Sequence, residues 1–145
     1  MRIAIEHAGA ERGLLILLRG DQQQIAAEAS TRQGRIEVTL RQAAVTPSEL
    51  PGSMLQYVIR TGESVILDDA STQNPFDSDA YIRERHARSI LCLPLINQAK
   101  LIGLLYLENN LTPHVFTPTR ISVLKLLASQ KYPDGVVRLR YAVVK

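Results

Sequence analysis

The sequence is poor in the residue types that build disulfide frameworks, metal clusters and aromatic stacking surfaces. Its 145 residues include one cysteine, no tryptophan, two phenylalanines and five tyrosines. A single cysteine excludes a disulfide framework and a zinc site built from several cysteines. So few aromatic side chains argue against a stacking platform for single-stranded nucleic acid.

Neither sign of charge is in excess over most of the chain. The formal net charge is +3, and residues 131–145, with four basic side chains and one acidic one, account for all of it. Residues 1–130 are therefore neutral. A nucleic-acid partner requires a concentrated basic stripe, and the main body of the chain does not supply one.

Long hydrophobic runs are also missing. No stretch approaches the about 18 consecutive apolar residues of a membrane-spanning helix. The N-terminal stretch MRIAIEHAGAERG contains charged residues and lacks the apolar segment of a secretory signal. We therefore expect a cytoplasmic chain without a membrane partner.

Hydrophobic patterning predicts an alternation of strands and short helices. Strands are predicted over residues 14–18, 25–29, 35–41, 64–67, 89–96 and 101–108. Helices are predicted over residues 54–61 and 81–86, with a last one opening at 118. The two most hydrophobic runs, 89–96 and 101–108, should form an antiparallel hairpin at the centre of the sheet. Pro94 cannot donate to a strand ladder, so we expect a bulge or a strand end beside it.

Polar residues at the predicted helix ends suggest how each helix is capped. Ser53 is the expected N-cap of the first helix, and Gly62 is its expected C-terminal stop. Ser78 or Asp77 should cap the second helix, and Thr117 the third.

The order of these segments resembles a GAF domain. The resemblance is carried by RTGESVILDDA at 60–70, SILCLPLI at 89–96, LIGLLYLEN at 101–109 and FTP at 116–118. It covers roughly residues 3–130 and is greatest to the GAF modules of multidomain bacterial sensor kinases, which combine a Ser/Thr kinase-like region, a GAF domain and a histidine kinase.

The resemblance implies an α+β fold: a central antiparallel sheet of about five to six strands with helices packed on both sides. Residues 1–130 would be the GAF-like domain, shortened at its first and last helices. Residues 131–145 would be a basic C-terminal tail or an extra strand. The family's ligand pocket would lie between the sheet and the loop–helix segment 68–88.

The resemblance also implies a regulatory or sensory module rather than an enzyme, in a parent protein with a kinase or other output domain. Side chains of segment 68–88 offer an aromatic wall, a hydroxyl group and cations for an anionic small molecule. The candidate ligand-binding residues are Asp69, Phe76, Asp77, Tyr81, Arg85 and Arg88.

A second interpretation is a ligand-free module that forms a homodimer through its terminal helices. That interpretation predicts a collapsed, apolar pocket in which Tyr81 packs inward and no polar group is left unpaired. The sequence leaves the choice between the two open.

A third interpretation, a chromophore sensor, depends on Cys92 for a bilin or on His86 for haem. Cys92 stands inside an apolar strand and is expected to be core. His86 ends a charged helix, a position that favours a solvated side chain. We therefore expect neither cofactor, and no metal site.

Other known activities of GAF domains lack their residues here. Methionine sulfoxide reduction requires a resolving thiol that a single cysteine cannot supply. The Asn-Lys and Asp-Glu pairs of some cyclic-nucleotide sites are replaced by Asn109-Asn110 and Arg120-Ile121. Asp68 and Asp69, as successive strand residues, would face opposite sides of the sheet and could not act on one substrate.

Overall fold

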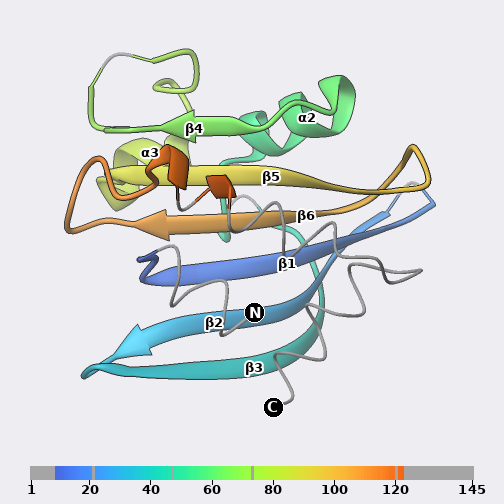
Figure 1. Ribbon diagram of the computed structural model, residues 1–145, viewed down its shortest axis with the longest axis horizontal. Helices are drawn as coiled ribbons and strands as arrows, with labels where there is room; N and C mark the ends of the chain where they lie inside the picture. Colours follow the sequence, from blue (N-terminus) through green and yellow to red (C-terminus); the bar gives the residue numbers. More distant parts are fainter. Residues whose placement is uncertain (1–8, 21, 47, 73, 120, 123–145) are drawn as a thin grey trace.

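One antiparallel sheet of six strands organises the chain, in the order β3-β2-β1-β6-β5-β4 (Figure 1). The computed structural model describes residues 9–20, 22–46, 48–72, 74–119 and 121–122. The strands are β1 (Arg12–Arg19), β2 (Gln22–Arg32), β3 (Arg35–Ala44), β4 (Val65–Leu67), β5 (Ser89–Asn97) and β6 (Lys100–Asn109). The α+β fold with a six-stranded antiparallel sheet confirms the prediction.

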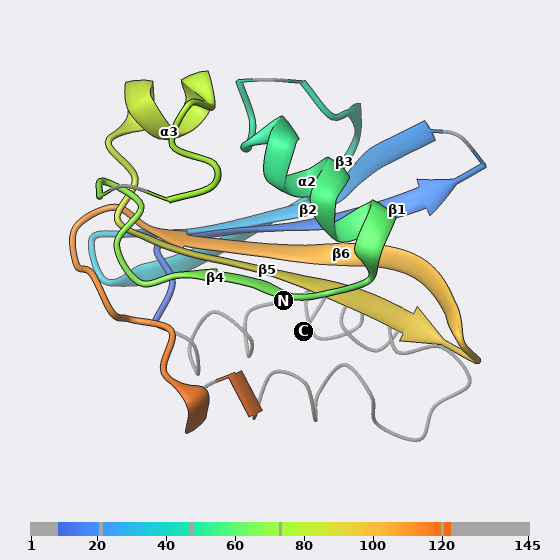
Figure 2. The same cartoon turned by 90° about the horizontal axis from the view of Figure 1, so that it is seen from above.

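Helices cover both faces of this sheet. Helix α2 (Gly52–Thr61) and helix α3 (Ala80–Arg85) lie on one face, and the first turn of a last helix, beginning at Pro118, lies on the other (Figure 2). The backbone amide of Ile121 donates to the carbonyl of Thr117 at 2.9 Å, which places the start of this helix where it was predicted. No helix among the described residues is long and apolar enough to cross a membrane.

Successive side chains of the central strands point to opposite faces of the sheet, so the buried side chains form two cores, one on each face. The core under the last helix contains Leu15, Leu91, Leu93, Leu95, Leu105, Leu107, Val115, Phe116 and Ile121. The core under α2 and α3 contains Leu14, Ile16, Ile90, Cys92, Leu104, Tyr106, Met54, Leu55, Val58 and Ile82. Because both faces are covered, these strands read as continuous hydrophobic runs rather than as alternating ones.

The β5–β6 hairpin forms as predicted, although only β6 lies at the centre of the sheet. There β6 pairs with β1, whereas β5 is separated from the sheet edge only by the short β4. Pro94 stays in register opposite Leu104, and the irregularity expected beside it falls between Leu95 and Ile96.

The predicted caps of the two complete helices need correction. Helix α2 starts after Pro51 without a side-chain cap of its own, and Ser53 instead donates to the carboxylate of Asp79. Asp79, rather than Ser78 or Asp77, is the N-cap of α3, where it accepts the amide of Tyr81 at 3.0 Å. At the start of α2, the Asp79 carboxylate, 26 positions from Ser53 in sequence, thus accepts the hydrogen bonds that a local N-cap would accept.

The C-terminal ends of both helices have left-handed backbone. Gly62 ends α2 with φ 69°, which confirms its predicted role. His86 ends α3 with φ 52°, a conformation that costs a side-chain-bearing residue free energy. The strand expected in residues 131–145 and the helix end expected near residues 3–7 lie outside the described residues.

Gly103 allows β1 and β6 to approach closely, and this contact gives a stability prediction. A Cβ atom at this position would collide with the backbone carbonyl oxygen of Ile16. Gly103→Ala should lower the free energy of unfolding by about 1–3 kcal/mol, because two backbones must separate. Gly52→Ala is the matched control, since a Cβ there meets nothing within 4 Å. Equal denaturation midpoints for the two variants would contradict the prediction.

Candidate ligand site beneath helix α3

A buried carboxylate lies between the sheet and α3. The Glu108 residue on β6 is only 3% exposed. The Tyr81 hydroxyl donates to it, 2.9 Å from Oε1 and 2.7 Å from Oε2. The Tyr106 hydroxyl lies 2.8 Å from Oε2, and Arg12 Nη1 lies 3.3 Å from Oε1. Three donors from three elements therefore converge on one carboxylate.

Strand register explains why these groups meet. Arg12 and Glu108 are direct cross-strand partners in the β1–β6 pair. Tyr106 lies two residues before Glu108, and side chains two apart in a strand share a face. Helix α3 lies above that face and brings Tyr81 down onto it.

Arg12 continues the network away from Glu108. Its Nε lies 2.8 Å from Glu28 Oε2, and its Nη2 lies 2.9 Å from Glu49 Oε2. The Glu49 backbone carbonyl also accepts from Nη1 at 2.7 Å. Arg41 bridges the same two glutamates, at 3.1 Å from Glu28 and 2.9 Å from Glu49. The ion pairs therefore link the centre of the sheet to the edge strand β3.

The environment fixes the protonation of these groups. Burial opposes the charge on Arg12, but the carboxylates around it, Glu108 first, outweigh this effect and raise the pKa of Arg12. Burial and then Glu108 raise the pKa of both Tyr81 and Tyr106. The hydrogen bond from Arg41 is the main cause of the lowered pKa of Glu49. Both phenols thus stay protonated as donors around neutral pH.

A second contact ties the two ends of segment 68–88 together. Arg88 Nε lies 3.1 Å from Asp69 Oδ1, and Nη2 lies 3.2 Å from Oδ2, a two-pronged ion pair. The Ser71 hydroxyl and amide also donate to Asp69, and they are the main cause of its lowered pKa, with Arg88 adding to them. The backbone amide of Ala70 donates to the Arg88 carbonyl beside them.

The remaining predicted residues lie apart from one another. Phe76 makes an edge contact with Tyr57 of α2, with ring centroids 5.7 Å apart. The Arg85 guanidinium lies 5.4 Å from the Tyr81 ring centroid, and its Nη2 lies 3.2 Å from the Ser48 carbonyl. Asp77 is exposed in the loop and accepts the Asn74 amide at 3.3 Å.

The six predicted residues thus form separate contacts instead of one set converging on a single point. Arg85 stacks on the Tyr81 ring, Arg88 pairs with Asp69, and Phe76 contacts Tyr57 of α2. The groups that do converge under α3 were absent from the prediction: Glu108, Tyr106 and Arg12. The available signal was the i, i+2 pair of Tyr106 and Glu108 at the end of an otherwise apolar strand.

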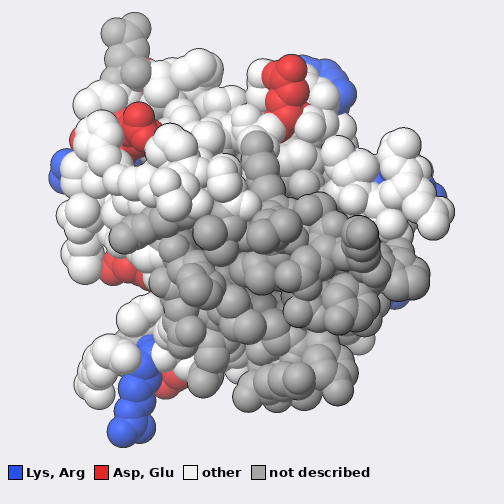
Figure 3. Space-filling model, viewed as in Figure 1, with Lys and Arg blue, Asp and Glu red and all other residues white. Residues whose placement is uncertain are grey.

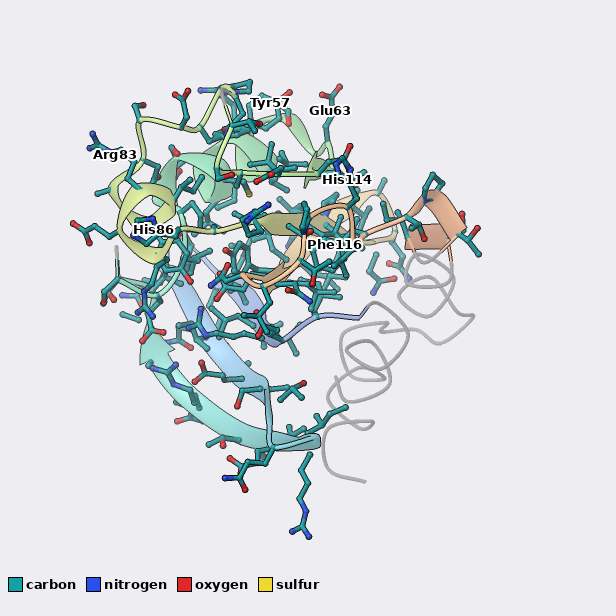
Figure 4. All side chains as sticks on the ribbon, turned by 90° about the vertical axis from the view of Figure 1, so that its left-hand side faces the viewer. Tyr57, Glu63, Arg83, His86, His114 and Phe116 are labelled. Atoms are coloured by element: carbon teal, nitrogen blue, oxygen red, sulfur yellow. The ribbon has the colours of Figure 1, made fainter. Side chains whose placement is uncertain are left out.

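The residues considered for cofactors lie in unsuitable positions. Cys92 is fully buried in β5, and burial raises the pKa of its thiol to about 12. His86 is exposed at the end of α3, the helix that also carries the exposed Arg83 (Figure 4). Within the described ranges, no three His, Cys, Asp or Glu residues are grouped so that they could hold a metal ion.

Comparison with known families identifies the fold. The family model of the GAF domain matches residues 1–130. The chain belongs to the GAF family.

Two histidine kinases contain segments similar in sequence to this chain. Hybrid signal transduction histidine kinase G of Dictyostelium discoideum is 38% identical over 78 residues, which cover 54% of this chain and 2% of that protein. Histidine protein kinase 1 of Candida albicans is 27% identical over 112 residues, 76% of this chain and 4% of that protein. The chain therefore spans a small part of each relative. The similarity to histidine kinases agrees with the predicted resemblance to the GAF modules of sensor kinases.

A solved structure agrees in fold with this GAF domain. The GAF domain of the Acinetobacter phosphoenolpyruvate-protein phosphotransferase superposes with a TM-score of 0.64 at 22% identity, covering 99% of this chain and 80% of that one.

The charged residues of the present domain do not form a single patch on the face shown in Figure 3, where the described Lys, Arg, Asp and Glu side chains are scattered.

The hydroxyl groups around Glu108 generate a stability prediction for this GAF domain. Tyr81→Phe and Tyr106→Phe should each lower the free energy of unfolding by about 1–3 kcal/mol, because each takes a donor from a buried carboxylate. Tyr57→Phe is the matched control, since its hydroxyl donates to exposed Glu63 at 3.2 Å. Chemical denaturation measures all three, and losses as small as that of Tyr57→Phe would refute the structural role of Glu108.

Asp79 generates a second prediction, because its carboxylate serves both helices. Oδ1 caps α3 through Tyr81, and Oδ2 accepts the amide and hydroxyl of Ser53 in the first turn of α2. Asp79→Ala should cost about 1–2 kcal/mol and speed amide exchange at Ser53 and Tyr81 together. Asp77→Ala, two residues earlier in the same loop, should change neither. Faster exchange at only one of the two helices would contradict the shared cap.

Proposed function

We propose that this GAF domain is the non-catalytic regulatory module of a histidine-kinase signalling protein, and that it binds a small molecule between the sheet and segment 68–88. The similarity to segments of two histidine kinases supports the setting, in which a kinase serves as the output domain. The observation that supports the site is the buried Glu108 with its three donors beneath α3.

Buried polar clusters generally give no stability advantage over well-packed apolar residues at the same place. Removing charges from water costs about as much as their pairing returns, so replacing a buried ion pair by well-packed apolar residues is often neutral or stabilising. The opposite face of the same strands packs with leucines. Retaining Glu108, Tyr106 and Arg12 under α3 therefore favours a recognition role, because ligand sites combine an apolar wall with a few convergent polar groups.

Binding would be transmitted through α3. A ligand that makes its own hydrogen bonds to Glu108 favours conformations in which Tyr81 is displaced, and it shifts the population toward them. Since Asp79 holds the N-terminal ends of both helices, displacement of α3 also disturbs α2. We propose that the terminal helices carry this change to a partner subunit.

The chemistry of the site supports binding rather than catalysis. The two phenols have raised pKa values and remain donors, and Arg12 is permanently charged. The fully buried thiol of Cys92 is neither ionised nor accessible at neutral pH. Covalent attachment of a bilin to Cys92 would require β5 to be exposed, so we rank a chromophore sensor below both other functions.

The second candidate function is a ligand-free dimerisation module. It is favoured by the inward packing of Tyr81 and by the internal partners of the candidate residues, among them Asp69 with Arg88 and Phe76 with Tyr57. The charged network beneath α3 opposes it, since that interpretation expects an apolar interior there.

Native mass spectrometry of the purified domain, compared with the denatured protein, distinguishes the two functions. A sensor should retain an extra mass that disappears on denaturation, and Glu108→Gln should lose it. Glu63→Gln, which changes an exposed carboxylate on the α2 side, should keep it. Bare protein under native conditions, present as a dimer, would refute the sensor and support the dimerisation module.

A further inference from the structure

We propose that the small molecule recognised beneath α3 is an organic cation carrying N–H donors, with Glu108 as its specificity-determining residue and Tyr81 as the internal group it displaces. This inference rests on the proposed function and names its ligand class. It reverses the charge expected from the arginines of segment 68–88.

The first argument concerns the charges that remain on the sheet side. Five charged side chains make up the network: Arg12, Arg41, Glu28, Glu49 and Glu108. Two arginines against three glutamates leave one negative charge. Each of these residues belongs to a strand or to the segment just before α2. The excess negative charge therefore stays with the sheet when α3 moves.

The second argument concerns the charge that α3 brings. Arg85 lies over the Tyr81 ring at 5.4 Å, and its positive charge lowers the pKa of that phenol against the larger effects of burial and Glu108. With α3 in place, the Arg85 guanidinium adds one positive charge beside Tyr81, although it forms no ion pair with the glutamates among the described contacts. Displacement of α3 removes Tyr81 and Arg85 together, so the site then lacks both a donor to Glu108 and a positive charge.

The third argument is that Arg88, Arg12 and Arg41 are already engaged by carboxylates and are therefore poor receptors for an anion. Arg88 is engaged by both carboxylate oxygens of Asp69. Arg12 and Arg41 are each held by two or more glutamates. An anion entering under α3 would meet the buried Glu108 carboxylate, whereas an ammonium or guanidinium group would replace the Tyr81 hydroxyl as the donor to Glu108 with a charge-assisted hydrogen bond. Arg12 Nη1, which also donates to the Tyr81 hydroxyl at 3.1 Å, would keep its acceptors on the Glu49 carbonyl and on Glu108. An apolar ring on the cation would fill the volume of the Tyr81 ring.

Cavity complementation tests this assignment. Tyr81→Ala removes the internal group, and three probes with similar ring size and different charge are then titrated calorimetrically: benzylamine, benzyl alcohol and benzoate. We expect benzylamine to bind at least about tenfold more tightly than benzyl alcohol, the difference between a charge-assisted and a neutral hydrogen bond. Benzoate should bind more weakly than both.

Glu108 must be the cause of that preference. In Tyr81→Ala/Glu108→Gln, benzylamine and benzyl alcohol should bind equally well, whereas Tyr81→Ala/Glu63→Gln should keep the tenfold difference. Benzyl alcohol or benzoate binding as tightly as benzylamine to Tyr81→Ala would overturn the proposal, and so would a preference that survives Glu108→Gln.

A second pair of variants keeps Tyr81 and applies if Tyr81→Ala does not fold. Arg85→Ala removes the positive charge beside Tyr81, whereas Arg83→Ala removes an exposed charge of α3 that is not stacked on Tyr81. Arg85→Ala should raise the affinity ratio of benzylamine to benzoate several-fold, and Arg83→Ala should leave it unchanged; equal ratios would overturn the proposal. An anion retained in native mass spectra would refute the cation while leaving the sensor function intact.

Discussion

The cross-strand pairing of Arg12 with Glu108 is the contact on which the arrangement beneath α3 depends. It is set by the β1–β6 register, and a shift of β1 by one residue would turn Arg12 to the leucine-rich face, away from Glu108. Once the pair is fixed, Glu108 provides the acceptor for Tyr81 and Tyr106, and Arg12 provides the donor for Glu28 and Glu49. The position of α3 thus follows from strand pairing far from it in sequence.

Sequence patterning was sufficient to locate the strands and helices, because each has its own hydrophobic period. Their assembly into one antiparallel sheet with helices on both faces was predicted from the resemblance to GAF domains. The six strands and the start of the last helix lie where alternation, apolar runs and the Thr117-Pro118 pair put them. Patterning was insufficient for the helix caps. Ser53 is a good local candidate, but the carboxylate that serves α2 is that of Asp79, which only tertiary packing brings near.

The site could be predicted only in part for the same reason. Segment 68–88 stands out as a long polar stretch, and within it Tyr81 does point toward the sheet. Its partner Glu108 lies near the end of an apolar strand, where the sequence alone predicts the end of the strand rather than a buried hydrogen-bond acceptor. Nothing local in the sequence indicates that Arg88 engages Asp69, because the hydrogen-bonding of two side chains 19 positions apart is decided by how β5 lies beside the loop.

The junction of Asp69, Ala70 and Arg88 has a consequence for how such domains diversify. An ion pair and a backbone hydrogen bond close the intervening chain at its two ends, next to the sheet. The exposed residues enclosed by this junction can change in identity or number without altering the strands, since loop length costs little once the ends are joined. Asp79 and Tyr81 are exceptions, because they contact α2 and Glu108. The exposed part of this segment can therefore vary in sequence and length among related domains while the six-stranded sheet stays the same.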